Sequence, residues 1–255
     1  MQEIITKQAL PVIKGRGATI NPENRFERLK VEIEPQWLEY EEDRKISTEY
    51  FIDHSQEILA KNDSPDVSFT YSINPYRGCE HGCIYCYARP THEYFGLSAG
   101  LDFETKIMVK RDAAELLARK FRSPHWVPQV VVMSGNTDCY QPIEKELQIT
   151  RLCLEVFLKF RNPVGVVTKN ALVLRDLDLL QELTKFSCVR ATLSITTLNH
   201  ELARKMEPRT SPPAKRLQAL EKLAAAGIPT VVNIAPLIPG LTEHEVPEIL
   251  KEAAS

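Results

Sequence analysis

The sequence predicts an α/β protein with a parallel sheet, preceded by an extended arm. From residue 68 onward, short apolar runs alternate with longer stretches in which apolar residues recur at helical spacing. Strand and helix units in such alternation imply a parallel sheet with right-handed crossovers. Residues 1–67 are polar, charged and weakly periodic. We therefore expect an N-terminal arm with little core of its own, which wraps onto a core domain of residues 68–255.

Five strand–helix units account for the core domain. The first strand leads into a cysteine-rich loop, and the later strands are short apolar runs suited to burial in a parallel sheet. The longest helix is indicated by apolar residues that recur every three or four positions, and Gly227 ends the fourth helix as its C-cap. The predicted strands are 68–73, 129–133, 165–168, 189–196 and 230–234, and the predicted helices are 113–121, 144–160, 176–184, 213–226 and 243 onward.

Composition and charge exclude several classes of protein. The formal net charge of −2 over 255 residues gives no global signature of nucleic-acid binding. No apolar run reaches the length that spans a membrane, and residues 1–20 lack an apolar signal segment. We therefore expect a cytoplasmic protein, in which thiols stay reduced. The charged run at 41–45 is expected to be solvated.

Three cysteines, Cys79, Cys83 and Cys86, are spaced as CxxxCxxC. A reduced cysteine cluster indicates metal binding or catalysis rather than a disulfide framework. A structural zinc site and an ordinary 4Fe–4S cluster each take four protein ligands. Three thiolates on one loop thus leave a position open for an external ligand. The alternative is a zinc site completed by His81 or His92.

Polar residues follow each predicted strand. These loops are 134–142, 168–170, 194–197 with 207–210, and 235–243. In parallel α/β sheets, ligands bind at the carboxyl ends of the strands. Any one of these loops alone is as well explained by a helix cap or a turn, but their common position favours one shared site.

The cysteine triplet, with an aromatic Tyr85 before the last cysteine, resembles the cluster loop of the radical S-adenosylmethionine (SAM) superfamily. The resemblance implies a partial TIM barrel of the (β/α)6 type. It also implies a 4Fe–4S cluster on Cys79, Cys83 and Cys86, with SAM bound to the open iron. Reductive cleavage of SAM would yield a 5′-deoxyadenosyl radical that abstracts a hydrogen atom. The electron would come from a reductant such as flavodoxin or ferredoxin.

The same resemblance assigns cofactor-binding positions in the later loops. Residues 236–243 are similar to the GxIxGxxE motif on the adenine side of SAM, with Pro236 in place of the first glycine. Lys169 suits the SAM carboxylate, and Ser194 and Thr196 suit the ribose. The full set of expected cofactor contacts is Tyr85, Tyr87, Asn136, Thr137, Asp138, Lys169, Ser194, Thr196 and Ile238.

Within the superfamily, the sequence is most similar to the spore photoproduct lyase-like group, also labelled DNA repair photolyases. The segments that carry this similarity are 74–79, 83–87, 136–138, 167–169 and 207–211. The resemblance implies lyase-type repair of a nucleic-acid lesion, with DNA as a candidate partner. The group's cysteine hydrogen donor aligns with Gly135 here. Cys139 and Tyr140 are therefore the candidate catalytic residues on the substrate side, and the alternative for Cys139 is a half-buried structural cysteine.

Two further expectations concern partners and completeness. A basic cluster near the fourth strand's exit either contacts phosphates or is a solvated helix with Arg209 in a local turn network. Its members are Arg204, Lys205, Arg209, Lys215 and Arg216. The sequence ends within the helix after strand five, whereas the family barrel has a sixth strand. We thus expect a barrel truncated after strand five, in a piece of a longer protein. The competing function is a non-catalytic zinc- or Fe–S-bearing module that binds nucleic acid.

Overall fold

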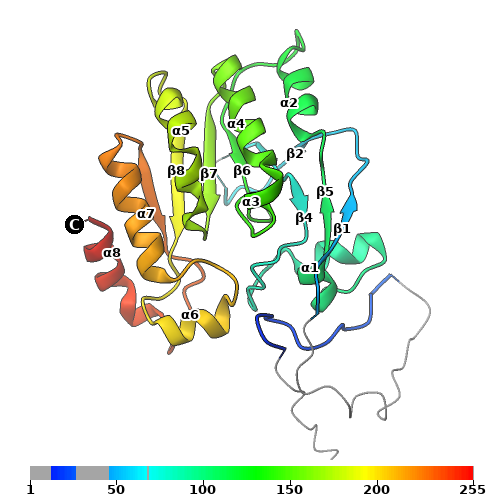
Figure 1. Ribbon diagram of the computed structural model, residues 1–255, viewed down its shortest axis with the longest axis vertical. Helices are drawn as coiled ribbons and strands as arrows, with labels where there is room; N and C mark the ends of the chain where they lie inside the picture. Colours follow the sequence, from blue (N-terminus) through cyan, green and yellow to red (C-terminus); the bar gives the residue numbers. More distant parts are fainter. Residues whose placement is uncertain (1–12, 27–45, 68, 255) are drawn as a thin grey trace, which may run out of the picture.

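A six-stranded sheet organises the chain. The computed structural model describes residues 13–26, 46–67 and 69–254. The strand order is β2-β3-β6-β7-β8-β9, in which β3 to β9 are parallel and β2 pairs antiparallel with β3 at the edge (Figure 1). The strands are β2 Leu59–Lys61, β3 Tyr71–Ile73, β6 Val131–Met133, β7 Val164–Thr168, β8 Val189–Ser194 and β9 Thr230–Asn233. The predicted parallel sheet is confirmed, and in the described residues it is open between β2 and β9.

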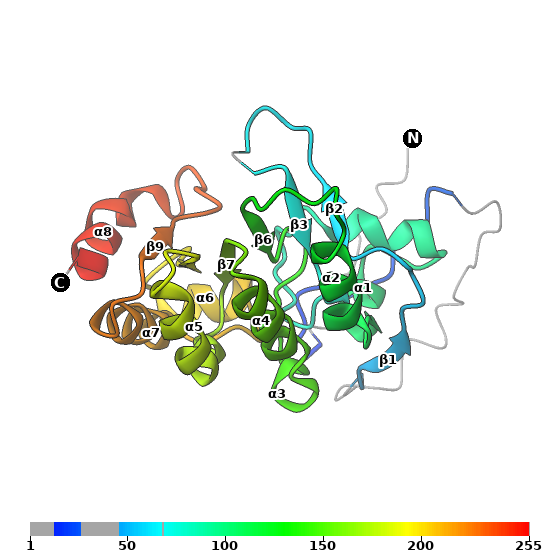
Figure 2. The ribbon, with the colours of Figure 1, turned by 90° about the horizontal axis from the view of Figure 1, so that it is seen from above.

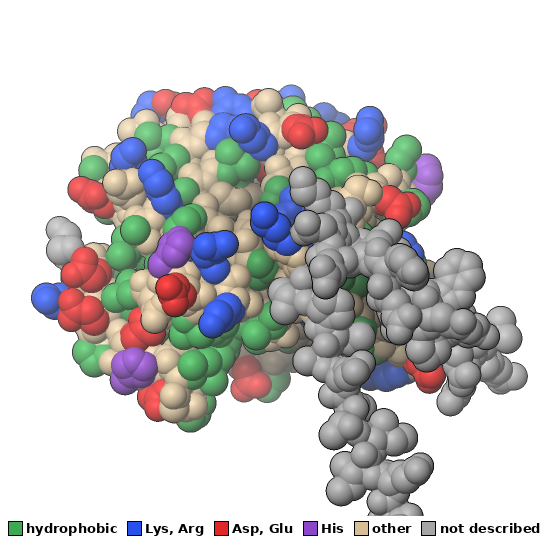
Figure 3. Space-filling model, turned by 60° about the horizontal axis from the view of Figure 1, so that its bottom comes forward, with side chains coloured by type: hydrophobic (Ala, Val, Ile, Leu, Met, Phe, Trp, Pro, Cys, Tyr) green, Lys and Arg blue, Asp and Glu red, His purple; other side chains and the backbone are tan. Residues whose placement is uncertain are grey.

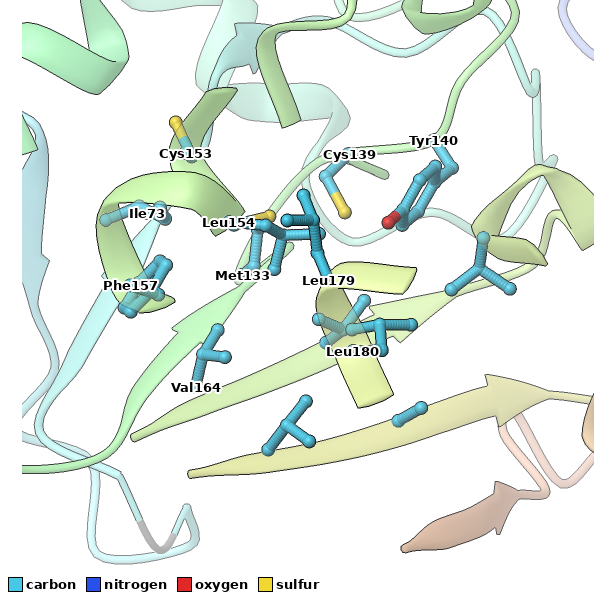
Figure 4. Close-up of a cluster of buried hydrophobic side chains, with 14 of the residues drawn as sticks. Ile73, Met133, Cys139, Tyr140, Cys153, Leu154, Phe157, Val164, Leu179 and Leu180 are labelled. Atoms are coloured by element: carbon cyan, nitrogen blue, oxygen red, sulfur yellow. The ribbon is translucent and has the colours of Figure 1, made fainter. Parts of the chain in front are cut away.

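Helices cover one face of this sheet, as seen from above in Figure 2. Between them and the strands lies a core of buried apolar side chains, part of which is drawn in Figure 4. The longer helices are α2 Ala113–Phe121, α4 Ile149–Phe160, α5 Leu177–Thr184, α7 Pro213–Ala225 and α8 Val246–Ala254. Shorter ones are α1 Leu101–Thr105, α3 Glu144–Leu147 and α6 His200–Met206, with 3₁₀ helices at Arg89–Phe95, Ala171–Asp176 and Glu243–Glu245.

The helix predicted over 144–160 is broken in two. Gln148, between α3 and α4, has a left-handed φ of 54°. The break lets the buried Glu144 carboxylate accept a hydrogen bond from the backbone N–H of Thr150 (3.1 Å) at the start of α4. The same carboxylate also accepts from Tyr76 and Arg175. A buried carboxylate needs such partners, and a continuous helix would hold the Thr150 N–H within its own ladder.

A second, smaller sheet lies beside the first, in the order β1-β5-β4. Its strands are β1 Glu49–Ile52, β5 Lys106–Val109 and β4 Tyr76–Arg77. Residues before position 68 therefore supply β1 to this sheet and β2 to the edge of the large one. The division into an arm and a core domain stays a prediction. The charged run at 41–45 and residue 68, predicted to begin the first strand, lie outside the described residues.

In the described part of the chain, no helix has both the length and the hydropathy that crossing a bilayer requires.

The helix α4 offers a test of the core packing. Leu154 is fully buried, whereas Leu152 on the same helix is 44% exposed. We expect Leu154→Ala to lower the free energy of unfolding by about 2–5 kcal/mol, because it leaves a cavity between helix and sheet. The matched change Leu152→Ala should cost about 0.5 kcal/mol or less. Urea titration of each variant measures both values, and equal costs would contradict the described packing.

Candidate cofactor site

The loop from Cys79 to Cys86, here called the cysteine loop, is held by backbone contacts from several elements. The N–H of Cys79 donates to the Phe103 carbonyl oxygen (2.9 Å), and the N–H of Ile84 donates to that of Met206 (3.0 Å). Gly78 begins the loop with φ 81°, and a Cβ there would lie 2.9 Å from the Phe103 oxygen. The cysteines are thus presented from a fixed backbone near the carboxyl ends of the parallel strands.

Gln141, in the loop after β6, binds the backbone on both sides of Cys79. Its side chain accepts from the N–H of Glu80 (3.0 Å) and donates to the carbonyl oxygen of Gly78 (3.2 Å). Gln141 is fully buried, so its amide joins two strand-end loops inside the protein. The sequence did not predict that Gln141 contacts the cysteine loop.

The three thiols suit a positively charged metal cluster. All six cysteines are free, Cys79 and Cys83 are buried, and Cys86 is half-buried. Burial raises the pKa of Cys79 well above its usual value and that of Cys83 to about 12, and it also raises the pKa of Cys86. Buried thiolates at neutral pH therefore require a strong positive partner, which iron supplies.

The described side chains are not grouped as ligands of a single zinc ion. Among the described residues, no three His, Cys, Asp or Glu side chains are grouped to hold a single ion. In a 4Fe–4S cluster each thiolate binds a different iron, so its ligands need not converge on one ion. The His81 ring nitrogens lie 3.3 Å from Asp138 and 3.4 Å from Asn170, and His92 Nε2 lies 2.8 Å from the Lys106 carbonyl oxygen. Both ring nitrogens of His81 thus have partners, whereas the buried Nδ1 of His92 has no hydrogen-bond partner among the described residues.

Asp138 joins the cysteine loop to the end of β7. Its carboxylate accepts from the hydroxyl of Thr168 and the N–H of Lys169, both at 2.7 Å, and lies beside His81. Burial alone would raise the pKa of Asp138, but His81 and these hydrogen bonds outweigh it and lower the pKa to about 2. The carboxylate is therefore ionised and internally satisfied, which indicates that it orders the loops.

Asn136 and Thr137, the other two expected cofactor contacts in the loop after β6, have different environments from Asp138. The backbone N–H groups of Asn136 and Thr137 donate to the side-chain oxygen of Asn74, at 2.8 and 3.3 Å. Both residues line a cavity of about 540 Å³ beside the cysteine loop. The cavity's further lining includes Asn74, Arg77, Tyr94, Phe95 and Lys110.

Four of the expected cofactor contacts meet around one buried carboxylate, that of Glu207. Tyr85 donates its hydroxyl to Glu207, and the Thr196 hydroxyl lies 2.6 Å from the same carboxylate. The Lys169 ammonium lies 5.8 Å from the centre of the Tyr85 ring. Ser194 joins the group through its carbonyl oxygen, which accepts from Arg216 (2.9 Å).

Glu207 and Arg216 form a buried ion pair that the sequence analysis missed. Each side chain is 1% exposed, and Arg216 also donates to Ser211 and Thr210. Burial alone would raise the pKa of Glu207, but Arg216, Lys169 and two hydroxyl donors lower it. A signal was present in α7, because Arg216 falls on the buried stripe of Pro213, Ala219, Leu220 and Leu223 at helical spacing.

The expected basic cluster is therefore wrong for one member, and a second member is held in an ion pair. Arg216 is internal, and Arg209 pairs with Glu80 (3.0 Å) in the cysteine loop. The exposed members are Arg204, Lys205 and Lys215. Figure 3, which brings forward the end that Figure 1 draws at the bottom, shows Lys and Arg side chains interspersed with apolar and acidic ones.

Tyr87 and Ile238 lie apart from this group. Tyr87 is 75% exposed, and its hydroxyl donates to the Gly135 carbonyl oxygen. Ile238 is half-buried in the turn after β9, where its N–H donates to the Thr242 hydroxyl (3.0 Å). Their assignment as SAM contacts stays a prediction.

Cys139 and Tyr140 are packed in the hydrophobic core (Figure 4). Both are 0% exposed, and the Tyr140 hydroxyl donates to Asp176 (3.0 Å). Burial raises the pKa of Cys139 well above its usual value. This placement gives no support to a substrate-side role, so the catalytic assignment of these two residues stays a prediction.

The model of the Radical SAM superfamily matches residues 73–253. The chain belongs to the radical SAM superfamily. Proteins of this superfamily use a 4Fe–4S cluster and SAM, and these are accordingly the cofactors of this chain. The cysteine loop and the strand-end residues described above lie inside the matched range.

Two curated relatives match most of the chain. An uncharacterised protein of Mycobacterium bovis is 36% identical over 193 residues, which are 73% of this chain and 57% of that protein. One of Methanocaldococcus jannaschii is 34% identical over 69% of this chain and 63% of its own length. The chain thus spans roughly three fifths of the length of these relatives.

The fold is similar to that of spore photoproduct lyase. The structure of that lyase complexed with dinucleoside spore photoproduct matches with a TM-score of 0.58 at 20% identity, over 80% of this chain and 56% of the lyase. A mutant of the lyase with bound AdoMet (SAM) and dinucleoside spore photoproduct matches with a TM-score of 0.57 at 22% identity. At this level of identity the likeness shows the radical SAM α/β fold.

The buried ion pair behind the site can be tested by charge removal. We expect Arg216→Met to lower the free energy of unfolding by about 3–5 kcal/mol, because it leaves the Glu207 carboxylate buried without its cation. The neighbouring Lys215→Met, at an exposed position of the same helix, should change it by about 0.5 kcal/mol or less. Denaturant titration measures both, and a small cost for Arg216→Met would refute the pairing.

Proposed function

We propose that this chain is the catalytic core of a radical SAM enzyme, with Cys79, Cys83 and Cys86 as the cluster ligands. One observation carries the proposal. A loop with three free thiols lies at the strand ends together with a lysine, a tyrosine and a threonine gathered around a buried carboxylate. Three thiolates leave one iron open, which is the position that SAM takes in this superfamily.

The residues around the thiols supply binding and orientation. The cluster and SAM, when bound, supply reductive cleavage of SAM to methionine and a 5′-deoxyadenosyl radical that abstracts a hydrogen atom. Burial raises the pKa values of Cys83 and Cys86, and the positive charge of Lys169, which lies over the Tyr85 ring, partly opposes that rise. Lys169 suits the SAM carboxylate. Glu207 fixes the hydroxyls of Tyr85 and Thr196, which suit the adenosyl side.

The proposed substrate is a nucleic-acid lesion, repaired by a lyase-type reaction. Support comes from the fold likeness to spore photoproduct lyase and from the cavity beside the cysteine loop. That cavity is lined by the aromatic rings of Tyr94 and Phe95 and by the basic Arg77, a combination suited to stacking a base and holding a phosphate. A reductant such as flavodoxin or ferredoxin and a cytoplasmic location belong to the same proposal.

The cluster assignment is tested by anaerobic purification and reconstitution. The wild-type chain should be brown and hold about four irons and four sulfides, and it should form 5′-deoxyadenosine from SAM after reduction. Cys79→Ala should lose both properties, because one cluster ligand is gone. Cys188 is a buried cysteine directly before β8. The variant Cys188→Ala should keep both properties. A colourless wild-type protein that holds one zinc would favour the binding-module alternative.

The substrate class is tested separately by DNA binding. A labelled single-stranded oligonucleotide should bind with an affinity that falls as salt rises, because phosphate contacts release counterions. The double variant Tyr94→Ala, Phe95→Ala should weaken binding, since stacking on aromatic rings contributes about 1–3 kcal/mol per base. Iron content serves as the control and should not change. Binding that is insensitive to both salt and these rings would count against a nucleic-acid substrate.

A further inference from the structure

The segment 13–18, here called the N-terminal strap, lies directly against the cysteine loop. Gly17 has no side chain, and a Cβ at this position would overlap the carbonyl oxygen of Gly82 and lie 3.1 Å from the Ile84 side chain. Both of those residues lie between the cluster cysteines in sequence. The strap therefore packs against the backbone between the cluster cysteines.

A fully buried carboxylate, that of Glu104 in α1, holds the strap in place. Its two oxygens accept from the N–H groups of Gly17 (3.0 Å) and Ala18 (2.8 Å). The same carboxylate accepts from Arg89 (2.6 Å). Arg89 in turn donates twice to the carbonyl oxygen of Cys83, at 2.9 and 3.1 Å. One carboxylate thus connects the strap with the backbone of a cluster ligand.

A second chain of contacts runs from the strap to the first part of the cysteine loop. Arg16 donates to the carbonyl oxygen of Glu104 (2.8 Å) and to the hydroxyl of Thr48 (2.9 Å). Thr48 donates to the carboxylate of Glu80 (2.9 Å), which follows Cys79 directly. Because Arg16 and Glu80 are both buried, these polar contacts are shielded from water, and leaving one of them unmade would be costly.

We propose that Glu104 is a positioning residue for the iron–sulfur cluster. Glu104 acts by clamping the N-terminal strap and Arg89 onto the cysteine loop. A buried carboxylate is tolerated only when its oxygens are satisfied, and three donors from two segments satisfy this one. Partners behind the metal ligands commonly govern ligand orientation and metal retention. This proposal rests on the assignment of Cys79, Cys83 and Cys86 as cluster ligands.

Two variants disturb the clamp by different means. Glu104→Gln keeps the shape but replaces one acceptor oxygen by an NH₂ group, which opposes the donors around it. Gly17→Ala keeps every charge and adds a methyl group that overlaps the Gly82 carbonyl; Gly17 lies outside the left-handed region, so the alanine brings no backbone strain of its own.

The matched control is Asp102→Asn on the same helix. Asp102 is also buried and holds the N-terminal segment, accepting from Asn21 (2.9 Å) and from the N–H of Ser98 (3.0 Å). These partners and Lys106, with which it pairs, lie outside both the strap and the cysteine loop. The control therefore loosens the attachment of the N-terminal segment without touching the clamp.

The experiment uses the anaerobically reconstituted chain and measures iron loss to a chelator and the midpoint potential of the cluster. Glu104→Gln and Gly17→Ala should each lose iron roughly 10- to 100-fold faster than wild type, because changes behind metal ligands typically weaken metal affinity by that factor. Both should shift the potential to more positive values, because water admitted beside the loop stabilises the more negative reduced cluster. Asp102→Asn should match wild type in both readouts.

Other outcomes would overturn the proposal. Wild-type rates and potentials in both variants would show that the strap has no influence on the cluster. An equal change in Asp102→Asn would assign the effect to general loosening of the N-terminal segment. If the wild-type chain takes up no iron, or Cys79→Ala retains it, the cluster assignment fails instead. Should Glu104→Gln not fold, Gly17→Ala decides alone.

Discussion

The need to pair buried charge governs the architecture around the thiols. The Glu207 carboxylate lies inside the protein, and it is tolerable there because Arg216 and the hydroxyls of Tyr85 and Thr196 surround it. These partners come from the cysteine loop, the segment after β8 and the helix α7. Removing any one of them leaves a polar group unsatisfied in a low-dielectric setting. The pairing requirement thus holds these two loops and α7 in one arrangement.

Hydrophobic periodicity predicted the scaffold well because it reports burial directly. The helix α2 lies at 113–121 as its spacing indicates, and each predicted core-domain strand has a counterpart. The break at Gln148 was not predictable, since the cause is a long-range contact of Glu144 with Tyr76 and Arg175. Local patterns carry no information about such partners. For the same reason, β1 and β2 went unnoticed in a polar region, where pairing partners rather than apolar content define the strands.

The site shows the same division between local signals and long-range contacts. The cysteine spacing predicted a metal-binding loop, and the strand-end rule predicted that the loops of Lys169, Ser194 and Thr196 lie near it. Arg216 was assigned to the surface because a charged residue in a helix usually faces water. Its position on the apolar stripe of α7 was the contrary signal. Cys139 was expected at the substrate side from proximity in sequence, yet its side chain points into the core.

The bond between Tyr85 and Glu207 spans 122 positions of the chain, and Arg216 lies further still along the sequence. During synthesis the cysteines emerge long before the residues that complete their surroundings. Until α7 has been made and packed, the Glu207 carboxylate lacks the Arg216 guanidinium that pairs with it. The hydroxyls of Tyr85 and Thr196 are then not yet held in place. The surroundings of the thiols are therefore complete only after β8 and α7 have been made. A ribosome-bound chain that presents only the CxxxCxxC motif would have the three thiols without the residues that surround them in the folded chain.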